Sequence, residues 1–155
     1  MNQPVAGQIL QDASLALQNV LRAIIDVEKR SRGMQSPFEL MREITTSEDW
    51  AWLRPLYALI ADMDHAFDGK EPLPATEIAA IGAHAIALLS GQGAPVEQQF
   101  LERYRGLLQL HTEIAFVHGA AIQALRRLPP EPDNESERLH GRHQWNERRR
   151  HLRGN

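Results

Sequence analysis

The chain of 155 residues contains no cysteine. Disulfide scaffolds, thiol nucleophiles and cysteine-ligated zinc or iron–sulfur sites are therefore excluded. No stretch approaches the ~20 consecutive apolar residues that cross a bilayer. Residues 1–5 lack the basic flank with which a signal peptide begins. We therefore expect a cytoplasmic protein that makes no contact with membranes.

Catalytic and phosphate-binding motifs are also missing. Gly91 and Gly93 are not followed by the lysine and the serine or threonine of a phosphate-binding loop, and no serine lies in a nucleophile elbow. The sequence thus favours a protein that is not an enzyme. We expect no cofactor, apart from the transition metal considered below.

The net charge is only −3, but the charges are unevenly distributed. Residues 1–130 carry 11 basic and 15 acidic side chains, whereas residues 138–155 carry six arginines and one glutamate. Between these parts, three prolines within 129–132 disfavour helix. We expect a helical bundle domain at 1–128. It is followed at 129–155 by an acidic, proline-rich linker and a flexible tail rich in arginine and histidine, which is disordered or becomes helical only on a partner.

Helical periodicity dominates the predicted domain. Between Pro4 and Arg32, apolar side chains recur every three or four residues and so lie on one face of a helix. They are Leu10, Ala13, Leu17, Val20, Ile24 and Val27. Capping serines, early prolines and apolar periodicity predict further helices at 37–44, 47–67, 75–89 and 95–128. Because of Pro55, the helix at 47–67 either begins near Trp52, with the proline in its first turn, or is kinked there. This pattern predicts an all-α fold, an antiparallel bundle of four main helices with one short extra helix.

Two histidines interrupt the apolar stripe of the last predicted helix. The stripe consists of Phe100, Tyr104, Leu107, His111, Ile114, His118, Ala121 and Leu125. Counting about 100° per residue also places Glu28 and Asp64 inside the bundle, and His84 at its edge. The same count places Asp62 on the solvent side of its helix.

Two interpretations of these inward groups stay open. In the first, His111 and His118 are structural, each hydrogen-bonded to a carboxylate such as Asp64 and together fixing the helix register. In the second, they form a metal or acid–base site with Glu28 or Asp64, because imidazole and carboxylate suit zinc, iron or manganese. The two histidines are ~10 Å apart along a helix, too far for both to bind one ion.

Trp50 and Trp52 lie close to Arg54 near the start of the third predicted helix. Residues two positions apart cannot share one face of an α-helix, so one ring could enter the core while the other contacts a partner. Aromatic and arginine side chains are typical of interaction hot spots. These three are therefore candidate partner-binding residues. In the alternative, both rings pack the end of the bundle.

The tail carries a second candidate surface. Its six arginines, among them Arg148, Arg149 and Arg150, are interleaved with histidines and with Trp145. Such an arm could contact phosphates while Trp145 stacks on a base, or could bind an acidic protein surface. The acidic residues at 131–137 could instead fold back and mask the arginines.

These patterns together predict a small helical interaction protein with an adaptor, chaperone-like or regulatory role. It would bind a protein partner, or a second copy of itself, through a helical surface that includes Trp50, Trp52, Arg54 and the tail arginines. The alternatives are the internal metal or acid–base site and nucleic-acid contact through the tail.

Overall fold

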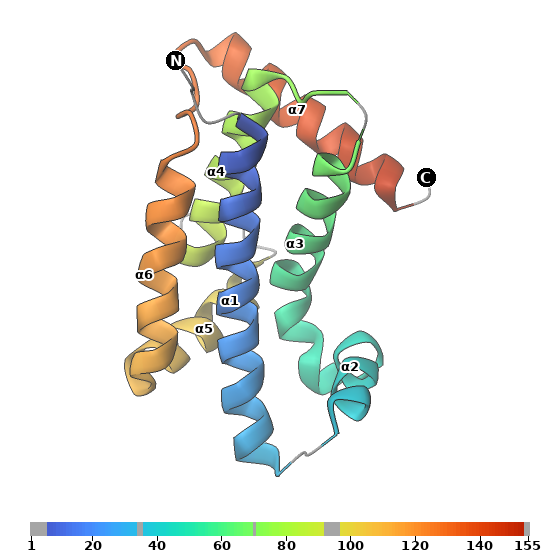
Figure 1. The fold of residues 1–155 in the computed structure, drawn as a ribbon, viewed down its shortest axis with the longest axis vertical. Coiled ribbons are helices and arrows are strands. Elements are labelled where there is room, and N and C mark those ends of the chain that lie inside the picture. The colour runs from blue at the N-terminus through green and yellow to red at the C-terminus, as the bar shows by residue number, and fades with distance from the viewer. Residues whose placement is uncertain (1–5, 34–35, 70, 92–96, 154–155) are drawn as a thin grey trace.

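The computed structural model describes residues 6–33, 36–69, 71–91 and 97–153. Within these ranges the fold is all-α, with seven α-helices, one 3-10 helix and no strand (Figure 1). The elements are α1 (Ala6–Arg32), α2 (Pro37–Thr46), η1 (Glu48–Leu53), α3 (Arg54–Phe67), α4 (Ala75–Ser90), α5 (Gln98–Leu110), α6 (Thr112–Arg126) and α7 (Glu135–Leu152). No helix of the described chain is long and apolar enough to cross a membrane. The expectations for residues 1–5 and for a helix start at Pro95 lie outside the described residues.

Helix α1 is the longest element and lies at the centre of the fold (Figure 1). All six residues of its predicted apolar stripe are buried, from Leu10 to Val27. This face packs against α6 and α3. Lys29, Arg30 and Arg32 occupy the last turn, where the helix dipole favours positive charge.

The chain after α1 forms α2, η1 and α3. Ser36 caps α2 as expected, because its side chain accepts a hydrogen bond from the Glu39 backbone nitrogen at 3.4 Å. The helix predicted at 47–67 is divided into η1 and α3, and α3 begins at Arg54, close to the alternative start near Trp52. Pro55 lies in the first turn of α3, where the backbone nitrogen needs no intrahelical acceptor. The division at Arg54 therefore accommodates the proline without a kink.

The single helix predicted at 95–128 is also two helices, which corrects that expectation. His111 separates α5 from α6 and has an extended backbone, with φ −129° and ψ 110°. Its carbonyl accepts hydrogen bonds from the backbone nitrogens of Ile114 and Ala115, at 3.1 and 3.2 Å, and so begins α6. No proline or glycine marks this corner, and the apolar spacing resumes beyond it, so periodicity could not reveal the break.

The tail predicted to be disordered forms helix α7, which is the second correction. Asn134 caps this helix by accepting a hydrogen bond from the Glu137 backbone nitrogen at 3.0 Å. Trp145 is only 2% exposed and belongs to the hydrophobic core. Gly141 lies against the backbone of Thr76 in α4. Figure 1 shows α7 lying across the ends of α3 and α4, so the core of the domain supplies the partner that orders the tail.

Candidate functional site

Both candidate tryptophans are buried, as in the alternative that packs them in the bundle. Trp50 donates from Nε1 to the Glu43 carboxylate at 3.1 Å, and Trp52 stacks on Phe100 with ring centroids 6.1 Å apart. Arg54 donates to the Ser47 carbonyl at 3.3 Å. The two rings therefore hold η1 against its neighbours and present little surface to a partner in this structure.

Glu28 connects the two tryptophans through arginines. Its carboxylate lies 3.5 Å from Arg32 and 3.8 Å from Arg103. The Arg32 guanidinium stacks over Trp50 at 4.8 Å, and that of Arg103 over Trp52 at 5.1 Å. Glu28 is buried on the inner face of α1, where the periodicity places it, and its environment is that of a paired structural carboxylate.

The other inward candidates have separate partners. Nδ1 of His118 lies 2.7 Å from the Tyr104 hydroxyl, and Asp64 accepts a hydrogen bond from the Ser14 hydroxyl at 2.6 Å. Burial lowers the pKa of His118 and raises the pKa of Tyr104. The imidazole is therefore neutral at pH 7, and Nδ1 shares one hydrogen bond with the Tyr104 hydroxyl. The expected hydrogen bond from His118 to Asp64 is replaced by this contact with Tyr104.

The four candidate metal ligands are not gathered at one point. Glu28 and His111 line a pocket of about 500 Å³ with Leu107 and Leu110. The Asp64 partner Ser14 lies about 21 Å from Glu28 along α1, at 1.5 Å per residue. Within the described ranges, no three histidine, aspartate or glutamate side chains are grouped to hold a metal ion.

The candidate arginines of the tail bind carboxylates of the same chain. Arg148 makes two hydrogen bonds to Glu77, at 2.6 and 3.0 Å, and Arg149 donates to Asp62 at 2.6 Å. Arg150 pairs with Glu147 at 2.9 Å on the surface. Glu77 and Asp62 are buried. The expectation that Asp62 faces solvent is thus wrong, because the single-helix count could not include the cover that α7 provides.

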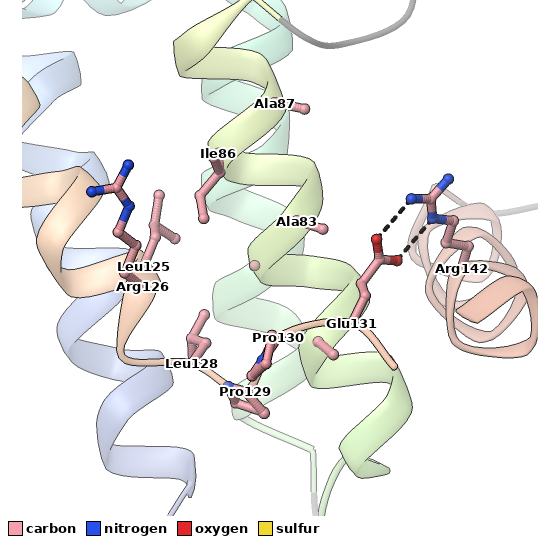
Figure 2. Close-up of a pocket in the computed structure, with 12 residues that line it drawn as sticks. Ala83, Ile86, Ala87, Leu125, Arg126, Leu128, Pro129, Pro130, Glu131 and Arg142 are labelled. Atoms are coloured by element: carbon pink, nitrogen blue, oxygen red, sulfur yellow. Dashed lines mark hydrogen bonds and ion pairs between the residues drawn. The ribbon is translucent and has the colours of Figure 1, made fainter. Parts of the chain in front are cut away.

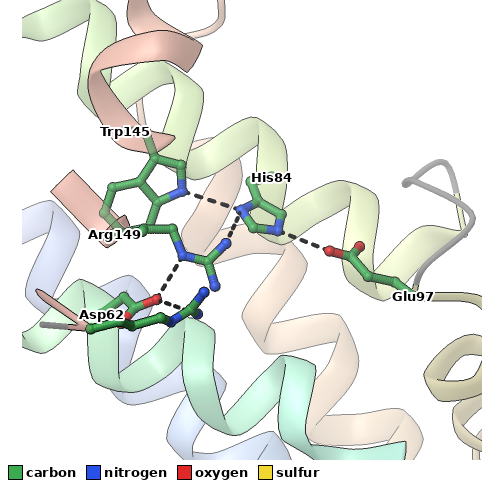
Figure 3. Close-up of polar contacts among 6 residues, drawn as sticks. Asp62, His84, Glu97, Trp145 and Arg149 are labelled. Carbon is green, nitrogen blue, oxygen red and sulfur yellow. Dashed lines mark hydrogen bonds and ion pairs between the residues drawn. The ribbon is translucent and has the colours of Figure 1, made fainter. Parts of the chain in front are cut away.

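His84 lies at the centre of the contacts between α7 and the bundle (Figure 3). Trp145 donates from Nε1 to Nδ1 of His84 at 3.2 Å, and Nε2 of His84 lies 3.2 Å from Glu97. Because an indole nitrogen can only donate, Nδ1 of His84 must accept, and the ring proton is on Nε2. This hydrogen bond from His84 lowers the pKa of Glu97. Trp145 and the imidazole therefore fix each other's orientation.

A shallow groove of about 480 Å³ runs between α4, the end of α6 and the linker to α7 (Figure 2). Small and aliphatic side chains such as Ala83, Ile86 and Leu128 line it. Arg126 borders the groove, and Glu131 closes part of it by a two-bond ion pair with Arg142, at 2.7 and 2.8 Å. The groove therefore reaches the carboxyl-terminal end of α6.

The outward side of α6 is unusual for a helix surface. Its exposed positions between the charged ends are Ala115, Phe116, Gly119, Ala120 and Gln123, hereafter the α6 face. Phe116 is 79% exposed, and Leu110 at the preceding corner is 78% exposed. On α1, by contrast, the exposed positions beyond Leu15 are polar or charged: Asn19, Arg22, Asp26, Arg30, Ser31 and Arg32.

Sequence reasoning missed the α6 face because it followed only the inward stripe of each helix. A signal was present, however: residues 114–125 contain no aspartate, glutamate, lysine or arginine. A surface helix normally has a charged or polar face toward solvent. A stretch without charge on any side lacks that face, which indicates that its outer side is also covered.

Comparison with protein-family models, with curated proteins and with solved structures found no match to this chain.

Proposed function

We propose that the protein is a small helical interaction module that binds a protein partner through the α6 face. The observation that carries this proposal is the exposure of Phe116, 79%, within a helix side that bears no charge between Glu113 and Arg126. A contiguous apolar surface on a helix is characteristic of a site that another macromolecule covers.

The composition of the α6 face fits the centre of a protein interface. Interface cores are depleted of charged residues and enriched in aromatic side chains, and a few anchors supply most of the affinity. Phe116 is such an anchor, and the neighbouring Gly119 and Ala120 leave a flat surface around it.

The residues first expected to bind a partner have structural contacts instead. Trp50 and Trp52 are in the core, and Arg148 and Arg149 neutralise buried carboxylates. Arg148 and Arg149 could bind nucleic acid only if these pairs were broken, which favours a protein partner at α6 over a tail site that uses them.

The test compares two phenylalanines of similar exposure. Phe116→Gln removes the anchor of the α6 face, and Phe38→Gln alters a side chain that is 82% exposed on α2. Glutamine is a good helix former, so neither change should unfold its helix. Immobilised protein should lose its bound partner, whether another protein or the chain itself, only with Phe116→Gln. Equal binding by wild type and both variants, measured by quantitative mass spectrometry of the retained proteins, would refute the proposal.

A further inference from the structure

We infer that the occupant of the α6 face is a second copy of this chain, with the two α6 helices packed antiparallel about a two-fold axis near Ala120. This inference rests on the proposed function and names the partner at that site. Three features of α6 carry it: the position of a glycine, the placement of the anchor, and the charges at the two ends.

Neither a close contact nor a positive φ angle requires glycine at position 119 within the monomer. A Cβ atom built at this position meets nothing within 4 Å, and φ of this residue is not positive. A glycine inside a helix lowers helix stability relative to alanine, so the folded chain alone does not explain it. Outside the monomer, however, its missing side chain lets a second helix approach closely at the middle of the α6 face.

The anchor and the small residues are arranged for a helix that lies along α6. Phe116 and Gln123 are seven residues apart and therefore lie on nearly the same line, on either side of Gly119 and Ala120. In a two-fold antiparallel pair, Phe116 of each copy lies next to Gln123 of the second copy. Both aromatic rings then pack beside the close contact of the backbones.

The ends of the face carry opposite charges. Glu113 lies in the first turn of α6, and Arg127 follows its last residue. The two are separated by 14 residues, two heptads, and so share one edge of the helix. An antiparallel pair centred on Ala120 places Glu113 of each copy beside Arg127 of the other, whereas a parallel pair would place like charges together. The helix dipoles also favour the antiparallel direction.

Contacts within the chain leave both charges accessible. Glu113 is paired with Arg30 at 3.0 Å, and Arg127 with Asp12 at 3.7 Å. All four side chains are at least two-fifths exposed. Exposed pairs of this kind contribute little and are easily extended by a third charge. The second copy would therefore join the ion pairs at each end without breaking a buried contact.

The experiment uses charge reversal on the full-length chain, with mass measured by light scattering during size-exclusion chromatography and by sedimentation equilibrium. Wild type should be dimeric. Glu113→Arg alone and Arg127→Glu alone should each weaken self-association by about tenfold or more, because two attractive contacts become repulsive. An equimolar mixture of the two variants should form a heterodimer, since every contact is again between opposite charges. The double variant should regain the homodimer.

Controls separate the interface from the fold. Arg30→Gln and Asp12→Asn remove the intrachain partners and should leave the dimer intact. Circular dichroism should show unchanged helix content in every variant. A dimer that survives both single reversals, or a mixture that does not recover, would overturn the inference.

The inference and the proposed function can fail separately. If wild type is monomeric at all concentrations but Phe116→Gln abolishes capture of a different protein, the second copy is refuted and the proposed function stands. If Phe116→Gln changes neither self-association nor capture, both are refuted.

Discussion

The last two helices use their side chains in opposite ways. Helix α7 has the most polar composition, yet Arg148 and Arg149 bind buried carboxylates and Trp145 lies in the core. Helix α6 has an uncharged central stretch, yet it exposes Phe116 to solvent. Composition alone would assign binding to the arginine-rich helix and structure to the apolar one. The contacts show that composition does not decide which side chains are available to a partner, because Arg148, Arg149 and Trp145 are already held by groups of their own chain.

The difference has a physical cause in the neighbours of each helix. Glu77 and Asp62 are buried by the packing of α7, and a buried carboxylate is costly unless a cation and hydrogen bonds compensate it. The arginines of α7 supply this compensation. No described element covers the outer side of α6, so its apolar atoms stay in water.

The largest effect is expected from removing the anchor of α7. Trp145→Ala should lower the free energy of unfolding by about 3–5 kcal/mol, because it empties a fully buried aromatic site. It also leaves His84 without its indole donor. Urea unfolding measures the loss, and limited proteolysis should cleave first within residues 135–152. Trp145→Phe keeps most of the apolar volume and should lower the free energy of unfolding by clearly less than the alanine variant does. A loss below about 1 kcal/mol for the alanine variant would show that α7 is not part of the cooperative core.

Matched glycine substitutions sharpen the comparison between the helices, because they should change the free energy of unfolding in opposite directions. At Gly141 of α7, a Cβ atom would clash with the Thr76 carbonyl oxygen, so Gly141→Ala should lower the free energy of unfolding by about 1–3 kcal/mol. At Gly119 of α6 the space is open, and Gly119→Ala should stabilise the monomer by about 0.5–1 kcal/mol.

Chemical denaturation of both glycine variants at low protein concentration provides the measurement. Destabilisation by Gly119→Ala would mean that an element of the same chain covers α6. Stabilisation by Gly141→Ala would mean that α7 does not pack closely on α4.

Much of the fold could be predicted from the sequence because apolar periodicity reports which side of a helix is buried. It placed the stripe of α1 and the cap at Ser36 correctly, and the all-α class follows from it. The corner at His111 could not be predicted, since the same spacing continues on both sides. The order of α7 could not be predicted either, because it depends on Glu77 and Asp62, more than 70 residues away in the chain.

The candidate site was harder to predict than the fold. Periodicity identified Glu28 as an inward carboxylate, and its partner Arg32 lies one turn along the same helix. Its second partner, Arg103, lies on α5, and no single-helix pattern contains the position of α5 relative to α1. For the same reason, His118 was assigned to Asp64 and is instead bonded to Tyr104. An exposed apolar surface such as that around Phe116 is defined by the lack of a neighbour, which only the assembled fold reveals.

The smallest effect concerns the inward histidine of α6. Burial lowers the pKa of His118 below the ordinary value of 6.5, so the unfolded chain takes up the proton at higher pH than the folded one. The contribution of this difference to stability is fully present above pH 6.5 and is lost as the pH falls through the lowered pKa. Stability curves of wild type and His118→Gln should therefore approach each other on acidification below pH 6.5. The amide of glutamine can either donate a hydrogen bond to the Tyr104 hydroxyl or accept one from it, so the variant removes the titrating group and keeps a hydrogen-bonding partner. Parallel curves between pH 7.5 and pH 5 would show that the imidazole is as accessible to protons in the folded chain as in the unfolded one, and that α6 is less firmly packed on its inner side than the burial of Ile114 and Ala121 indicates.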